Sequence, residues 1–268
     1  MDAWTEAAAA ADRIGVKVVE LTGAAELAEC SALLQRVWRA EHPAEICSPS
    51  MLRTYVHSGN YVAGAYRGAA LVGASVGFWG RHGEHTHLHS HLAGVERDGH
   101  GHGVGYALKM HQRAWTLARG VDEVHWTYDP LILRNAYFNL QKLGASAAEY
   151  LPEFYGAMTD GINAGDLTDR ILVVWRLDRP RTQPAAPADA VPLVSRTDDR
   201  HPKLCDMSDS RILSVAVPVD AEQLRAVDRD AALAWRVAVR DALMSRLAAG
   251  YRIAGMTRDG HYLLERAS

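Results

Sequence analysis

The stretch Val95-Glu-Arg-Asp-Gly-His-Gly-His-Gly-Val-Gly-Tyr106 carries four glycines at alternating positions, 99, 101, 103 and 105. Residues 87–95, which lead into it, alternate with the period of two that is typical of a half-buried strand. Residues 104–119 then repeat apolar side chains at helical spacing. Glycine permits close backbone approach, and the free N–H groups at a helix start favour an anion. The stretch therefore predicts a phosphate-binding loop; a mobile loop without a ligand is the alternative.

The composition limits the function classes. At 268 residues the chain can form one large domain or two modest ones. Its three cysteines are odd in number and widely spaced, so we expect no disulfide framework, which fits a reducing cytoplasm. Residues 1–11 do not resemble a secretion signal, and no apolar run reaches the roughly 20 residues that span a membrane. A formal charge of −3 gives no general reason to bind nucleic acid.

Periodicity and turn signals give the order of the expected elements. They are a strand over 16–21, helices over 24–38 and 49–59, a hairpin over 61–79 that turns at 67–68, a strand over 87–95, the glycine loop with its helix, a strand over 121–128, a helix over 134–143 and a strand over 171–177. This order predicts an α/β (α+β) fold whose central sheet is mixed, mostly antiparallel and flanked by helices.

The proline-rich composition of residues 179–192 predicts a linker between two domains, 1–178 and 193–268. The second domain is expected to be a smaller β-α-β-β module, with a strand over 212–217, a helix over 221–249 and strands over 251–257 and 261–265. With about 75 residues it is marginal alone, so we expect it to pack on or near the first domain. Whether it covers a pocket or forms a homodimer interface stays open.

Two common phosphate-binding loops do not fit the stretch. No Lys-Ser/Thr pair follows its last glycine, so a nucleoside triphosphate would lack its usual ligands. A dinucleotide fingerprint opens a parallel βαβ unit and needs a third glycine, whereas this loop follows antiparallel strands and continues as Val104-Gly-Tyr-Ala107.

The segment His100-Gly-His-Gly-Val-Gly105 resembles the Gln/Arg-x-x-Gly-x-Gly/Ala signature of the GNAT acyltransferase superfamily, with histidine in place of the first residue. The order of elements is also similar. Further stretches resemble a poorly characterised subgroup of predicted acetyltransferases with a C-terminal extension: 126–131, 134–139, 142–144, 155–163, 234–240 and 250–252. The resemblance spans roughly residues 16–265. It implies the GNAT fold and direct transfer of an acetyl or succinyl group from acyl-CoA to the amine of a small molecule such as an amino acid.

The resemblance also implies where coenzyme A binds. The loop would hold its pyrophosphate, and a backbone N–H at the end of the preceding strand would hold the thioester oxygen. The expected cofactor-binding residues are Leu92, Ala93, Val95, His100, Gly101, His102, Gly103, Val104, Gly105, Tyr106 and Asn135. His100 and His102 are alternatively solvent-facing, and Asn135 alternatively caps a helix.

Four histidines, at positions 85, 87, 89 and 91, share one face of the expected strand because they occupy alternate positions. Imidazole near neutrality suits removal of a proton from an amine. We expect His89 to be the general base and His91 to be its partner or substitute. A solvated strand face and a metal site are the alternatives, but the sequence indicates no third ligand and we predict no metal.

The proton donor and the residues that hold the acceptor are the remaining parts of the expected site. The resemblance implies a tyrosine where the chain has Leu140, which cannot donate a proton. Tyr137, one turn earlier, is the expected acid, with Tyr128, water, or plain packing of Tyr137 as alternatives. Asp129 is expected to hold a substrate ammonium and Arg134 a carboxylate, unless they pair with each other. The missing tyrosine also leaves open an inactive module that binds or senses acyl-CoA.

Overall fold

The computed structural model describes residues 2–40, 46–96, 103–156, 166–179, 189–206 and 208–266. The chain divides into two compact units, made mainly of residues 1–126 and of residues from Thr127 onward. Arg176–Asp178 also belong to the first unit. The domain limits expected at 178 and 193 stay a prediction, because most of the proline-rich segment lies outside the described residues.

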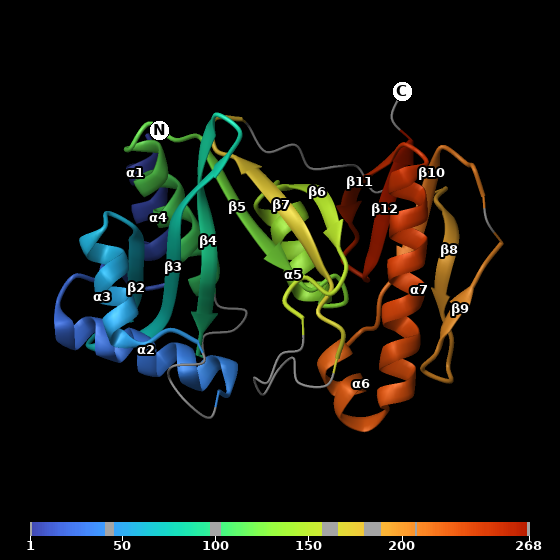
Figure 1. Cartoon of the computed structure of the whole chain (residues 1–268), viewed down its shortest axis with the longest axis horizontal. Helices are drawn as coiled ribbons and strands as arrows, with labels where there is room; N and C mark the ends of the chain where they lie inside the picture. Colours follow the sequence, from blue (N-terminus) through green and yellow to red (C-terminus); the bar gives the residue numbers. More distant parts are fainter. Residues whose placement is uncertain are drawn as a thin grey trace. The chain divides into compact units, whose positions relative to one another are not determined.

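The first unit is built on a mixed sheet (Figure 1). Its strands lie in the order β1 (Lys17–Glu20), β2 (Tyr61–Arg67), β3 (Ala70–His82), β4 (His85–Val95) and β5 (Glu123–Tyr128), the last of which ends in the second unit. Neighbours from β1 to β4 are antiparallel, and β4 runs parallel to β5. The predicted class, a mixed and mostly antiparallel sheet flanked by helices, is confirmed.

Helices cover both faces of this sheet and create two separate cores. Helices α2 (Ala24–Trp38) and α3 (Pro49–His57) pack one face through a cluster that includes Leu27, Leu52 and Leu92. Helices α1 (Ala3–Asp12) and α4 (Val104–Leu117) pack the other face, where Val104 and Leu108 are buried. Helix α1 was not predicted; it begins where the side chain of Asp2 accepts a hydrogen bond from the Thr5 N–H.

The second unit contains its own sheet in the order β11-β12-β10-β8-β9. The strands are β8 (Val191–Arg196), β9 (Pro202–Leu204), β10 (Ile212–Ala216), β11 (Tyr251–Met256) and β12 (His261–Arg266). Of these, β8 and β9 were not predicted. The expected helix over 221–249 is in fact two helices, α6 (Ala221–Val227) and α7 (Arg229–Ala248), because Asp228 leaves helical geometry and its side chain caps α7.

The rest of the second unit holds α5 (Leu133–Tyr137), a π-helical turn (Phe138–Lys142), β6 (Ser146–Leu151) and β7 (Arg170–Arg176), of which the last residue belongs to the first unit. The first two replace the single regular helix expected over 134–143. Strand β6, which pairs antiparallel with β7, was not predicted. Over the ranges that the structure describes, no helix has the length and apolarity needed to cross a membrane.

Candidate active site

Strand β4 contains a β-bulge at His91. Its neighbours keep antiparallel partners on β3, since Ser90 pairs with Gly77 and Leu92 pairs with Val76. These two partners are adjacent in β3, so His91 is the extra residue. A bulge bends a strand and redirects its side chains, and such bulges are frequent beside active sites. The alternating sequence gave no sign of it.

The other edge of β4 pairs with β5 over a short distance. The described pairs are Leu88 with Val124 and His89 with His125, and none follows toward the C-terminal end of β4. A strand edge that leaves its neighbour presents backbone N–H and C=O groups that an extended ligand can use. This is the segment in which the sequence analysis expected the thioester contacts.

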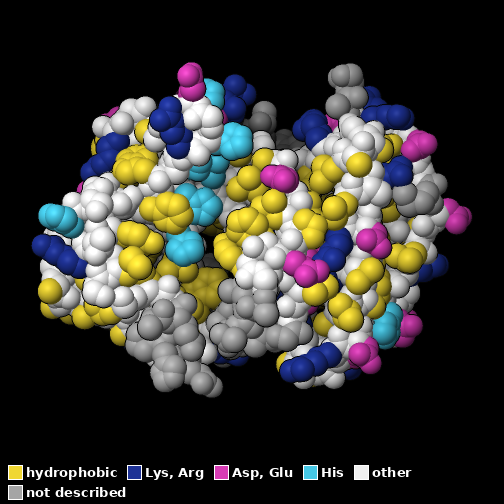
Figure 2. Space-filling model, viewed as in Figure 1, with side chains coloured by type: hydrophobic (Ala, Val, Ile, Leu, Met, Phe, Trp, Pro, Cys, Tyr) yellow, Lys and Arg dark blue, Asp and Glu magenta, His cyan; other side chains and the backbone are white. Residues whose placement is uncertain are grey.

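The histidine band, which we define as His87, His89 and His91, lies on the face of β4 that is turned toward α3. Its ring centroids follow one another at 6.5 and 6.4 Å. Phe78 of β3 stacks on His89 at 5.0 Å and lies 5.7 Å from His91, and Tyr55 of α3 lies 6.2 Å from Phe78. Figure 2 shows histidine side chains gathered over β4 beside hydrophobic ones. Three of the four predicted histidines, His87, His89 and His91, therefore share one face, and aromatic rings pack beside them.

Burial keeps the histidine band uncharged near neutral pH. It lowers the pKa of His89 to about 4, and the neighbouring histidines act in the same direction. Burial also lowers the pKa of His91. A general base must be unprotonated before it acts, so both rings meet that requirement.

A second row of side chains continues from His87 onto β5. The ring of His87 stacks on His125 at 3.9 Å with an interplanar angle of 12°. His125 lies 2.9 Å from Glu123, which also contacts Arg176 at 3.1 Å. Among the described residues, the buried Nδ1 of His87 has no hydrogen-bond partner. Sequence reasoning missed His125, although Glu123 and His125 alternate along an expected strand.

The start of α4 has the geometry that an anion site needs. Gly103 occupies the N-cap with a left-handed φ of 87°, and no side chain of the described part of the chain caps the helix. A Cβ on Gly103 would lie 3.2 Å from Ile14. Because the N-terminal N–H groups of a helix favour negative charge, this end can accept a phosphate. The predicted contacts His100, Gly101 and His102 lie outside the described residues.

The remaining predicted cofactor residues of the first unit differ in exposure. Val104 and Leu92 bury their side chains in the cores, so only their backbone can contact a ligand. Val95 packs beside the core under α4. Ala93 is exposed, and Gly105 and Tyr106 are half-buried in the first turn of α4.

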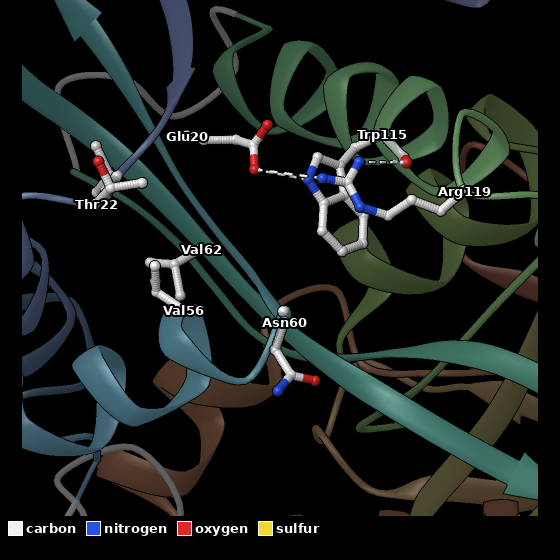
Figure 3. A pocket seen from close by; sticks show the side chains of 9 residues that line it. Glu20, Thr22, Val56, Asn60, Val62, Trp115 and Arg119 are labelled. Atoms are coloured by element: carbon white, nitrogen blue, oxygen red, sulfur yellow. Dashed lines mark hydrogen bonds and ion pairs between the residues drawn. The ribbon is translucent and has the colours of Figure 1, made fainter.

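The first unit has another hollow, of about 200 Å³, and side chains that line it already contact one another (Figure 3). The indole N–H of Trp115 donates to Glu20 at 2.7 Å, and the guanidinium of Arg119 lies 3.7 Å from the Trp115 ring centroid. The other lining residues are Leu21, Thr22, Val56, Gly59, Asn60 and Val62. Because Glu20 and Arg119 already have partners, this hollow is not our candidate site.

The second unit gives the two predicted substrate contacts partners within the chain. Asp129 is buried, and its carboxylate accepts hydrogen bonds from Arg236 at 2.6 and 3.0 Å and also from Arg225. Burial alone would raise the pKa of Asp129, but the two arginines hold it well below its usual range. Arg134 binds Glu222 through two hydrogen bonds of 2.7 and 2.8 Å. Asp129 and Arg134 thus pair with other residues, and their substrate roles stay predictions.

The other two predicted residues of this unit lie on α5. Its N-cap is Ile132, so the exposed Asn135 lies inside the first turn and does not cap the helix. Tyr137 ends α5 and is half-buried. Leu140 is buried in the π-helical turn, so it contributes packing.

No family model and no curated protein matches the sequence. Solved structures that are similar include aminoglycoside 6'-acetyltransferase type Ii, at 19% identity over 61% of this chain and 99% of that one, with a TM-score of 0.48. The ribosomal-protein-S18-alanine N-acetyltransferase from Escherichia coli matches at 14% identity over 62% and 96%, with a TM-score of 0.49. A GNAT family acetyltransferase from Elizabethkingia anophelis with acetyl-CoA bound matches at 13% identity over 60% and 98%, with a TM-score of 0.46.

Proposed function

We propose that this chain is an acyl-CoA-dependent N-acyltransferase of the GNAT type, which transfers an acetyl or succinyl group to the amine of a small molecule. One observation carries the proposal. A single strand, β4, bears uncharged histidines next to a bulge and leads to a helix that begins at a left-handed glycine. A proton acceptor and an anion site are therefore joined by one short segment, as acyl transfer from coenzyme A requires.

The donor would extend along this segment. Its pyrophosphate would lie at the N-terminus of α4, where Gly103 permits close approach. Its pantetheine arm would follow β4 beyond the two residue pairs that join β4 to β5. A backbone N–H near Leu92 or Ala93 would then donate to the thioester oxygen and stabilise the negative charge that forms there.

The reaction would proceed by direct attack with both substrates bound. The amine nitrogen forms a bond to the thioester carbon, and His89, or His91 in its place, accepts the proton that the nitrogen loses. The carbon–sulfur bond then breaks, and the thiolate takes a proton from Tyr137 or from water. An amide and free coenzyme A result.

The acceptor would be a small molecule. Tyr55, Phe78, His89 and His91 together form a wall of rings, and no charged side chain belongs to it. Such a wall suits an amine with a compact apolar or aromatic body. An amino-acid acceptor held by Asp129 and Arg134 would require both side chains to exchange their present partners. A cytoplasmic location and a homodimer complete the proposal.

One observation favours an alternative function. The position where the superfamily resemblance implies a proton-donating tyrosine holds Leu140, and this side chain is buried. A module that binds acyl-CoA without turning it over would not need that donor. The alternative is therefore an inactive acyl-CoA sensor.

The two functions are separated by measuring binding and turnover on the same preparation. Binding of CoA is measured by calorimetry, and thiol release is followed with acetyl-CoA and succinyl-CoA. The acceptors are an arylalkylamine, an acidic amino acid and a polyamine. We expect CoA binding and thiol release that depends on an acceptor. Binding without release for any acceptor supports the sensor, and absence of binding contradicts both functions.

A further inference from the structure

Lys109, on α4, is a buried cation that the reaction described above does not use. Its side chain is 6% exposed. Among the described residues no carboxylate forms an ion pair with it; its Nζ instead lies 3.8 Å from the ring centroid of Trp126. Burial lowers the pKa of Lys109 to about 7. Placing an ammonium group where no acid compensates it is costly, so an apolar residue would serve packing better.

The hydrogen bonds of Lys109 indicate why the chain keeps it. The Nζ donates to Ser90 Oγ at 2.9 Å and to Gln112 Oε1 at 3.0 Å. The amide of Gln112 in turn donates to Ser75 Oγ at 3.4 Å. One buried polar chain therefore runs from β4 through α4 to β3.

The two serines lie on opposite sides of the bulge. Ser90 pairs with Gly77 immediately before His91, whereas Ser75 pairs with Ala93 after it. The polar chain thus bridges the bulge from the α4 face, while the histidine band lies on the α3 face. Holding Ser90 in place fixes the backbone from which His89 and His91 project.

We propose that Lys109 is a positioning residue that holds the bulge of β4 through Ser90 and so sets the orientation of His89 and His91. The structural half of this proposal is independent of the activity. Its consequence for turnover rests on the proposed function.

The test compares Lys109→Met with Ser90→Ala, which breaks the same hydrogen bond from the other end. The control is Thr116→Val, because Thr116 is a buried polar residue of α4 that bonds to the carbonyl of Gln112 and not to β4. The ring signals of His89 and His91 are followed by NMR in the full chain as pH is varied. The kcat and the Kd for CoA are measured alongside.

We expect both variants to shift the His89 and His91 signals, and their titration, well beyond the shifts in Thr116→Val. The double variant should show no more than the larger single effect, since both substitutions break the same Lys109–Ser90 hydrogen bond. The kcat should fall about tenfold while the Kd for CoA changes less than twofold.

Unchanged histidine signals in folded Lys109→Met, or additive effects in the double variant, overturn the proposal. If Lys109→Met does not fold, Ser90→Ala decides by the same signals. If wild type shows no turnover, the proposed function fails, but the histidine signals still decide whether Lys109 holds the bulge.

Discussion

The histidine band of β4 and the buried ion cluster around Asp129 differ in the charge that they carry. In the band, the rings are uncharged, and no residue that the structure describes forms a hydrogen bond with the buried Nδ1 of His87. In the cluster, Asp129 and Asp166 both bind Arg225 and Arg236, so each charge meets two opposite charges. Uncharged rings can accept a proton from a substrate, whereas buried charges that already meet opposite charges hold a fold together. We therefore place chemistry in the band and stability in the cluster.

The largest effect should come from breaking the cluster. Asp129→Asn removes the carboxylate from Arg236, whose side chain is fully buried, and leaves an excess of positive charge. Breaking one side of a buried ion pair destabilises a protein by about 3–5 kcal/mol. Urea unfolding should show that loss in the variant.

The matched control for the cluster is Arg134→Ala. The pair of Arg134 with Glu222 is exposed, with 57% and 38% of the two side chains accessible. Its loss should change the free energy of unfolding by less than about 1 kcal/mol. If Asp129→Asn instead keeps full stability and abolishes turnover, the comparison is wrong and Asp129 is a substrate contact, as the sequence predicted.

The second-largest effect tests whether the histidine band supplies the general base. His89→Ala should lower kcat about 100-fold, within the range that general-base catalysis supplies. The CoA affinity should hardly change, because in the proposed site the ring would face the acceptor and not the phosphates. In wild type the rate should fall as the pH drops toward about 4, where His89 becomes protonated, and this limb should flatten in the variant. Full activity in the double His89/His91 variant would exclude both residues as the base.

A smaller effect tests the anion site at the start of α4. Gly103→Val should weaken CoA binding at least tenfold, because φ there is 87° and the new side chain would meet Ile14 at 3.2 Å. Gly120→Val is the control for backbone strain, since Gly120 has a similar φ of 74° and, apart from its chain neighbours, no described residue comes within 4 Å of its Cβ position. Calorimetry should find a normal Kd in the control. Equal weakening in both variants would remove the loop from the cofactor site.

Local patterns predicted the parts of the site that depend on one strand or one helix. The period of two placed His89 and His91 on one face, and the glycine run placed a left-handed residue before α4. The bulge at His91 was not predictable, because it is a property of the register between β4 and β3.

The other features that were not predicted from the sequence depend on residues that lie far apart along the chain. The arginines that bind Asp129 follow it by 96 and 107 positions, so no local pattern announces them. The burial of Lys109 also escapes sequence reasoning. A lysine in a helix normally faces water, and here α1 and the strands cover α4 from two sides.

The smallest effect is a pH dependence of the free energy of unfolding, which the buried Lys109 should cause. The native pKa of Lys109 is about 7, whereas an unfolded lysine keeps its proton to about 10.5. Between these values the unfolded state binds the additional proton, so the stability of wild type rises with pH. Lys109→Met has no amino group at this position, so its stability does not change with pH for this reason. The stability difference between the two proteins should therefore change in favour of wild type by about 1.4 kcal/mol from pH 8 to 9 and stay constant below about pH 6. Urea unfolding of both proteins across this range measures it, and a pH-independent difference would mean that Lys109 stays charged in its buried site.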